Sequence, residues 1–315
     1  MTLIEILVVV SVIAILVGIL IPALNKVQNT ARDVKQKGQF TAIDLGLAAF
    51  RSDYGDYPPS FWWDPGSPSL PQDYCGAQKL AEALLGWDLL GFHPDSAWRG
   101  DGLDAARGPD TYDPLQVYPA AVRQDNLKKR RDRYIELDVA NPFRLRESAV
   151  GLRDGLFPDV TPLAFRTYVL CDVFEVPERK LQLDRLDEAG RSAVPGTPIL
   201  YYKANPASKT INTGEYRDRI YNIRDNSPLV SLGKLADWRL PIPQRNEHWL
   251  NGPLRVRPNP YFTANEYYFY EYLRDPKVQT GDLPWPYRPD TYLLISAGRD
   301  GLYGTPDDIR NFGRR

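Results

Sequence analysis

The chain has 315 residues, of which 43% are hydrophobic and 12% aromatic, enough to form a packed core in one large or two small domains. Its 39 Lys and Arg nearly balance its 40 Asp and Glu, so the total charge argues against a nucleic-acid-binding protein. The two cysteines, Cys75 and Cys171, match no zinc or thioredoxin-type spacing. In an exported protein they can form one disulfide, and the alternative is two buried thiols.

An uncharged apolar segment, ILVVVSVIAILVGILIPAL, occupies residues 6–24. A helix of roughly nineteen residues, rising about 1.5 Å per residue, is long enough to span a bilayer core. A cleaved signal peptide needs a basic region before a shorter apolar stretch, so this segment predicts a membrane-spanning helix. Glu5 lies at its start, where an ionisable group is costly unless something neutralises it. A simple signal anchor explains the hydrophobicity but does not explain Glu5.

The N-terminal sequence MTLIEILVVVSVIAILVGILIPAL resembles the mature N-terminus of type IV pilins and type II secretion pseudopilins. In that family a methylated first residue, usually Phe, precedes Thr-Leu-Ile-Glu and a long apolar helix with a proline near its far end. The segment AFRSDYGDYPP also resembles the stretch after the long helix in pseudopilins. The residues that match the N-terminal pattern in place are Thr2, Leu3, Ile4, Glu5 and Pro22.

The resemblance implies roles for the first residues. Met1 would be the residue that a prepilin peptidase exposes and that is then methylated. The carboxylate of Glu5 would pair with the free α-amino group of Met1 in a neighbouring subunit, because opposite charges in a low-dielectric helix bundle are tolerated when paired. Met1 stands where Phe is common, and no basic leader ending in Gly precedes it. We therefore expect that the sequence starts at the mature residue or at a misplaced start.

The apolar segment is predicted to continue as one long helix. Pro22 removes a backbone donor and predicts a kink or a locally melted stretch over residues 18–22, although membrane helices also tolerate proline. Apolar residues recur at three- and four-residue steps across residues 25–54, which indicates an amphipathic helix that ends before Gly55 and Pro58. The whole helix would measure about 75 Å. Residues 1–24 would anchor in the membrane or fibre, and residues 25–54 would hold a head formed by residues 55–315.

The head sequence predicts mixed secondary structure. Short helices are expected in residues 76–86 and 127–137, with an exposed loop at 92–119. Aromatic and β-branched residues predict strands within 165–176, 198–204 and 290–298, whereas the segment from Thr263 to Asp275 can be helix or strand. The fold class expected is α+β and pilin-like: a long N-terminal hydrophobic helix packed on an antiparallel sheet, with insertions that enlarge the head.

After the last predicted strand comes SAGRDGLYGTPDDIRNFG, residues 296–313, which combines acidic residues with regularly spaced glycines. Calcium takes six to eight oxygen ligands from carboxylates and carbonyls, and such a loop can supply them. The segment resembles the C-terminal calcium loop of the major type II pseudopilins. The alternative is a solvated turn in which Asp308 caps a helical turn at Ile309. The ligands implied by the resemblance are Asp300, Asp307 and Asp308, with Ser296 and Leu302 as further oxygen donors.

Other residue groups are better explained by packing or solvation. His93 and His248 have no metal-site or catalytic spacing. The basic residues 128–131 read as a solvated helix face rather than a phosphate site, and Asp101, Asp104, Asp110 and Asp113 as an acidic loop rather than a second cation site. The aromatic clusters 61–63 and 267–272 could stack on sugars but more often form core or subunit interfaces. No catalytic motif is present, so we expect no enzyme.

The function predicted is that of a structural subunit of a type II secretion pseudopilus. The alternative is a surface type IV pilus subunit whose head has an adhesive or ligand-binding role. The expected partners are other copies of the chain, a prepilin peptidase, an inner-membrane assembly platform and minor pilins, with no nucleic acid. Before assembly the subunit would cross the bacterial inner membrane once with its head outside the cytoplasm, and would then enter a periplasmic pseudopilus or a surface filament.

Overall fold

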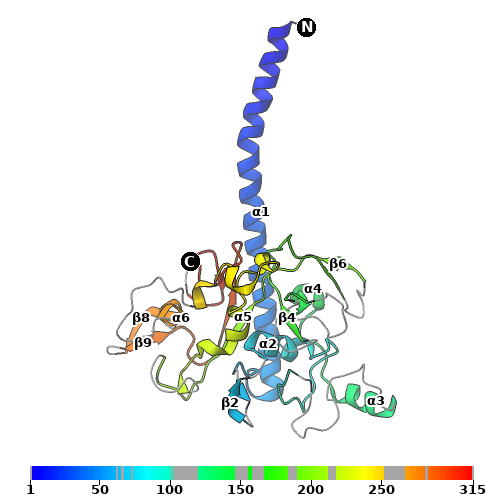
Figure 1. Ribbon diagram of the computed structural model, residues 1–315, viewed down its shortest axis with the longest axis vertical. Coiled ribbons are helices and arrows are strands. Elements are labelled where there is room, and N and C mark those ends of the chain that lie inside the picture. The colour runs from blue at the N-terminus through cyan, green and yellow to red at the C-terminus, as the bar shows by residue number, and fades with distance from the viewer. Residues whose placement is uncertain are drawn as a thin grey trace.

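The computed structural model shows one long helix that projects from a mixed α+β head (Figure 1). It describes residues 2–61, 63–64, 67–71, 74–100, 102, 120–145, 155–157, 167–183, 190–211, 218–251, 267–280 and 283–313. Its α-helices are α1 (Leu3–Tyr54), α2 (Gly76–Leu85), α3 (Ala120–Lys129), α4 (Leu137–Ala140), α5 (Ser227–Val230) and α6 (Tyr267–Leu273). The short 3-10 helices are η2 (Ile223–Asn226), η3 (Leu235–Asp237), η4 (Ile242–Gln244) and η5 (Trp249–Asn251).

Helix α1 begins and ends where the sequence predicts. At its C-terminus Gly55 adopts the left-handed conformation, φ 82°, and its N–H donates to the carbonyl of Arg51 at 2.8 Å. The helix runs unbroken through Pro22, so of the two alternatives for residues 18–22, a kink or a locally melted stretch, the melted stretch is wrong. A single proline removes only its own backbone hydrogen bond, and the turns on both sides keep theirs. Figure 1 shows a gently curved helix without a break.

The second half of α1 packs against a three-stranded antiparallel sheet in the order β11-β10-β7. The strands are β7 (Leu200–Lys203), β10 (Tyr292–Ser296) and β11 (Ile309–Arg310). Ile43 and Leu47 of α1 are fully buried in one apolar cluster with Tyr201 of β7 and Leu294 of β10. Burying such side chains contributes about 1.5–3 kcal/mol each. The predicted arrangement of a long helix on an antiparallel sheet is therefore confirmed.

Helix α2 completes this core, and each of its ten residues is buried. It crosses α1 closely at Gly46, where an added Cβ would lie 2.9 Å from Cδ2 of Leu84. A larger residue at this position would require the side chain of Leu84 to shift. The predicted helix at residues 76–86 is thus confirmed.

Among the described residues, four two-stranded antiparallel sheets enlarge the head, and three of them contribute side chains to a second apolar cluster. Their strands are β1 (Trp63–Asp64) with β2 (Ser67–Pro71), β3 (Pro142–Arg144) with β4 (Tyr168–Leu170), β5 (Leu181–Gln182) with β6 (Ser192–Ala193), and β8 (Arg274–Thr280) with β9 (Leu283–Pro286). The predicted strands in 165–176, 198–204 and 290–298 are present but shorter than predicted. The undecided segment after Thr263 contains α6 followed by the start of β8.

Two predictions for the head are met only in part. The helix expected within residues 127–137 is absent beyond Lys129, since α3 occupies residues 120–129 and the chain then runs irregularly to α4. The loop expected at 92–119 is not exposed at its start, because Phe92 and His93 are only 3% exposed. Most of the rest of that loop, including Asp101, Asp104, Asp110 and Asp113, lies outside the described residues.

Candidate functional site

Among the described residues, the first half of α1 is exposed and is not buried against the head. In the part of the chain that the structure describes, α1 is the one helix long and apolar enough to cross a membrane, and none of its most apolar window is buried. Large aliphatic side chains from Leu3 to Leu24 are exposed on all sides of the helix. A helix that is apolar all round is stable within lipid or among other apolar helices, so this segment is compatible with a membrane anchor or a signal sequence.

Glu5 closes the N-terminus of α1. Its Oε2 accepts a hydrogen bond from the N–H of Thr2 at 2.7 Å, and its own N–H donates to Oγ1 of Thr2 at 3.4 Å. This reciprocal pair is a capping box, which satisfies backbone donors that a helix start leaves without an intrahelical partner. The carboxylate therefore lies at the tip of the molecule, beside the chain start. Met1 lies outside the described residues.

The C-terminal loop between β10 and β11 brings several oxygen atoms around the hydroxyl of Thr305. This hydroxyl lies 2.7 Å from Oδ1 of Asp307, 3.3 Å from Oδ1 of Asp308 and 3.2 Å from the carbonyl oxygen of Leu302. The N–H of Asp300 donates to Oδ2 of Asp307 at 3.0 Å, and Oδ1 of Asp300 accepts from the N–H of Leu302 at 2.8 Å. Four of the five residues implied by the resemblance are thus close together. Thr305 is a further oxygen donor that the sequence analysis missed.

Ser296 does not join this group. It ends β10, is fully buried, and its Oγ donates to Oδ2 of Asp172 at 2.8 Å. Asp172 also accepts hydrogen bonds from the N–H groups of Phe174 and Thr197. The alternative of a helical turn at Ile309 is wrong too, because Ile309 pairs with Ser296 as part of β11.

The three acidic side chains of the loop differ in their electrostatics. Burial raises the pKa of Asp300, and the adjacent charge of Asp307 adds to this effect. Burial acts in the same direction on Asp307, but hydrogen bonds from Thr305 and from the N–H groups of Asp300 and Arg299 outweigh it and lower its pKa. Burial raises the pKa of Asp308 to about 7. Two carboxyl groups in contact favour sharing a proton or a cation.

The loop supplies the donor types that calcium prefers: carboxylate, hydroxyl and carbonyl oxygen. Asp300, Asp307, Thr305 and Leu302 can contribute them within one turn of chain. Among the described residues, no group of three or more His, Cys, Asp and Glu side chains has the arrangement of a metal site. A site here would accordingly depend on the hydroxyl and the carbonyl as well as on carboxylates.

The same loop contacts α1 where the helix leaves the head. Nη2 of Arg299 lies 2.6 Å from Oδ2 of Asp33 and 3.3 Å from the carbonyl oxygen of Asn29. The N–H of Arg299 donates to Asp307 at 2.7 Å, so one residue connects the acidic group with the helix. The conformation of the loop is therefore coupled to the position of α1.

His248 supports the loop from the core side. It is 2% exposed, and its Nδ1 accepts a hydrogen bond from the N–H of Tyr303 at 3.2 Å, which requires an unprotonated nitrogen. Burial lowers the pKa of His248 from 6.5 to about 4, and the charge of Lys234 also lowers it. The packing role expected for His248 is confirmed.

This lowered pKa predicts acid sensitivity. The unfolded state binds a proton near pH 6.5 that the folded state does not bind until about pH 4, so stability is lost as pH falls through this window. The titration of His248 should decrease the free energy of unfolding by up to about 1.4 kcal/mol for each pH unit of acidification in this window. His248→Asn keeps an acceptor but does not titrate, so denaturant titrations should show a flatter pH dependence than wild type. An equal slope in both proteins would contradict this assignment.

Cys75 and Cys171 are free thiols in this structure, both fully buried in the same apolar cluster. Of the two alternatives, a disulfide or two buried thiols, the structure has the two buried thiols. Burial raises the pKa of Cys75 to about 11 and that of Cys171 well above its usual range. Both thiols are thus protonated and unreactive at neutral pH.

No family model, no curated protein and no solved structure matches this chain. The geometry of α1 and of the C-terminal loop therefore carries the functional argument.

Proposed function

We propose that this chain is a structural subunit that polymerises through α1 into a type II secretion pseudopilus. The observation that carries the proposal is the division of α1 into two halves. The first half is apolar and exposed on all sides, while Phe40, Ile43 and Leu47 of the second half are built into the core. A rigid helix of 52 residues can thus hold the head while its free half packs among equivalent helices.

The position of Glu5 supports the same proposal. A carboxylate at the tip of an apolar helix is costly in a membrane or in a helix bundle unless a positive charge neutralises it. The α-amino group of a neighbouring subunit supplies such a charge if helices stack with a regular axial offset. Met1, after cleavage by a prepilin peptidase and methylation, would carry that amino group.

Calcium would stabilise the head in this proposal. The ligands would be Asp300, Asp307, Thr305 and the carbonyl oxygen of Leu302, with Asp308 close by. A bound cation would neutralise adjacent carboxylates and hold the loop in the conformation that contacts Asp33 on α1.

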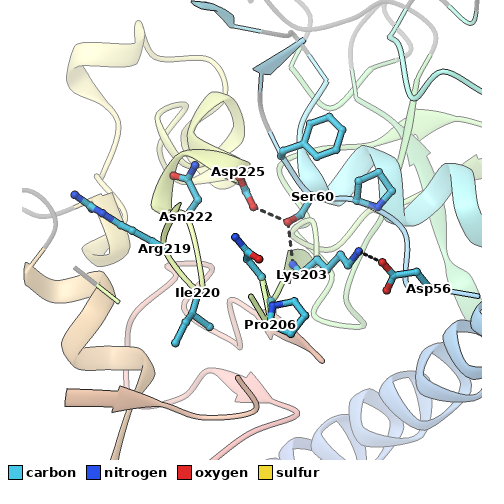
Figure 2. Close-up of a pocket in the computed structure, with 12 residues that line it drawn as sticks. Asp56, Ser60, Lys203, Pro206, Arg219, Ile220, Asn222 and Asp225 are labelled. Carbon is cyan, nitrogen blue, oxygen red and sulfur yellow. Dashed lines mark hydrogen bonds and ion pairs between the residues drawn. The ribbon is translucent and has the colours of Figure 1, made fainter. Parts of the chain in front are cut away.

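The proposed route of assembly starts in the bacterial inner membrane, with the subunit spanning it once and its head outside the cytoplasm. An inner-membrane assembly platform and minor pilins would then incorporate it into the periplasmic fibre. No catalytic step is assigned to the head. The second candidate is a surface type IV pilus subunit with a ligand-binding head, favoured by the added small sheets and by the cavity beside β7 (Figure 2).

The test is electron microscopy of filaments sheared from cells that express the protein at native level, with mass spectrometry of the N-terminus of the recovered subunit. A processed, methylated subunit confined to the cell envelope is expected for the pseudopilus. Long surface filaments built of this chain would favour the pilus instead. An unprocessed monomer found only in the membrane would contradict both functions.

A further inference from the structure

Residues 238–244, WRLPIPQ, form an exposed apolar tip on the head that includes η4. Leu240 and Ile242 are 43% and 42% exposed, and Pro241 and Pro243 beside them are exposed as well. Two large aliphatic side chains and two prolines in one short segment leave an apolar surface in water, and such surfaces mark interaction sites. Nothing in the proposed assembly uses this tip.

The tip is held in place from inside the head by Arg245. This side chain is buried, and its guanidinium donates to the carbonyls of Leu232 at 3.2 Å, Trp238 at 3.0 Å and Leu240 at 2.9 Å. Nε1 of Trp238 also donates to the carbonyl of Glu178, at 2.9 Å. These backbone carbonyls therefore face the head, while the aliphatic side chains of the tip face outward. A surface that is already ordered loses little conformational entropy when it binds.

The tip lies at the end of the head from which α1 emerges, where Figure 1 shows the yellow segments of the chain. Lys234 and Ala236, which precede the tip, line the same pocket as Arg299 of the C-terminal loop. Arg299 in turn contacts α1, with its Nη2 3.3 Å from the carbonyl oxygen of Asn29. The tip is thus close to the point where the apolar half of α1 begins to project.

The rise of α1 places this end of the head at the surface of a bilayer. The apolar segment ends at Leu24, and Asn29 follows five residues later. At about 1.5 Å per residue, Asn29 lies about 7.5 Å beyond the apolar core of the membrane. The headgroup layer on each side of that core is about 5–7.5 Å thick. When residues 6–24 span the membrane, this end of the head therefore meets the lipid headgroups.

The charges at this level suit anionic lipid. Arg239 is the single charged residue of the tip, and its side chain is exposed. On α1, Lys26 and Arg32 are exposed as well, whereas the acidic Asp33 forms an ion pair with Arg299. Tryptophan, arginine and aliphatic residues together are the residue types that bind at membrane surfaces, with the aliphatic groups below the headgroups and the cations among them.

We infer that the tip docks on the surface of the membrane that α1 crosses, with Leu240 and Ile242 below the headgroups and Arg239 at the phosphates of anionic lipids. The inference rests on the membrane-spanning role proposed for α1 but not on polymerisation. The contact holds the head of an unassembled subunit against the bilayer, so entry into a fibre has to break it.

The test uses the full-length protein, one copy in each lipid nanodisc of mixed phosphatidylcholine and phosphatidylglycerol. Leu240→Cys carries an environment-sensitive fluorophore, and the native thiols escape labelling because both are fully buried. The matched control is Leu127→Cys, since Leu127 is 42% exposed and lies on α3, at the opposite end of the head (Figure 1). Emission from position 240 should shift to the blue and be quenched by nitroxide-labelled lipids, whereas emission from position 127 should do neither.

Two further variants separate the possible results. Adding Arg239→Gln to the labelled protein should lower the docking equilibrium constant about fivefold with anionic lipid and leave it unchanged in phosphatidylcholine alone. A label at Ser11→Cys, in the apolar half of α1, reports whether the helix is inserted. Quenching at position 11 with none at position 240 overturns the inference alone, and no quenching at either position overturns the membrane anchor with it. A blue shift at position 240 that requires two copies per nanodisc and is not quenched by lipid assigns the tip to a contact between subunits, which also overturns the inference.

Discussion

Subunits that carry Glu5→Ala or Glu5→Gln are expected to fold their heads normally and to fail to assemble. The head does not depend on Glu5, because none of the most apolar window of α1 is buried in the head. In a fibre, removal of the carboxylate would leave the neighbouring α-amino group charged and unpaired among apolar helices. Breaking a buried ion pair in this way costs about 3–5 kcal/mol for each subunit added.

The structure makes Glu5→Gln the more informative variant. In the isolated subunit Glu5 also closes the helix start, through its hydrogen bond with Thr2. Glutamine can make the same capping box but carries no charge. An assembly defect in Glu5→Gln would therefore come from the lost charge and not from a frayed helix.

The measurement is the yield of sheared filaments, normalised to the amount of subunit in the membrane. Ser11→Ala is a suitable control, since Ser11 lies in the same exposed half of α1 and its Oγ only donates to the carbonyl of Val8. It should assemble as wild type does. Wild-type yields from Glu5→Gln would remove the proposed charge pairing.

Local sequence signals were sufficient to predict α1 and α2. The apolar periodicity, the left-handed glycine at residue 55 and the prolines after it act within a few residues of the helix end. Gly86 ends α2 in a similar way: its N–H donates to the carbonyl of Glu82 at 2.8 Å. Such elements are predictable because their causes are adjacent in the sequence.

Residues 130–136 show why the other helix prediction failed. The N–H of Arg131 donates to the carbonyl of Phe92 at 2.9 Å, and that of Tyr134 donates to the carbonyl of Leu84 at 2.8 Å. Because these N–H groups donate to carbonyls in and after α2, they cannot also form the hydrogen bonds of a helix over residues 130–136. The side chain of Arg130 is also buried in an ion pair with Asp88. Contacts this distant in sequence leave no local periodicity.

The acidic residues of the candidate calcium loop could be predicted from the sequence, but its complete set of oxygen ligands could not. The resemblance implied Asp300, Asp307 and Asp308, which lie close together in the loop. It also implied Ser296, whose hydroxyl donates to Asp172 instead. Only the fold shows that Thr305 lies between the acidic groups. In the Thr-Pro-Asp-Asp sequence this hydroxyl lies two residues before Asp307, and it donates to that carboxylate at 2.7 Å.

Calcium is expected to raise the melting temperature of the protein, and Asp307→Asn should remove most of this increase. A ligand that binds only the folded state stabilises it by about 2.7 kcal/mol at one hundred times its Kd. In a protein of this size that corresponds to a rise of several degrees. The comparison is calorimetric melting of full-length wild type and variant, each with calcium and with a chelator.

The choice of Asn rather than Ala is dictated by the loop itself. Asp307 accepts hydrogen bonds from the N–H groups of Arg299 and Asp300 and from Thr305. Alanine would lose these bonds and destabilise the protein even without metal, whereas asparagine keeps an acceptor and loses the charge that a cation needs. Asp290→Asn, at an exposed aspartate outside the loop, should retain the full response to calcium. Equal melting of the wild type in calcium and in chelator would exclude the metal.

Calcium could also affect filament assembly, because Arg299 of the loop forms an ion pair with Asp33 of α1. A loop that loosens without calcium releases one of the contacts that fix the helix where it leaves the head. The exposed pair contributes little to stability, about 0–1 kcal/mol, but it restricts the angle between head and helix. If calcium acts through this contact, Arg299→Ala should keep the calcium-dependent melting temperature and still lower the filament yield. Normal yield in that variant would limit the role of calcium to stabilising the head.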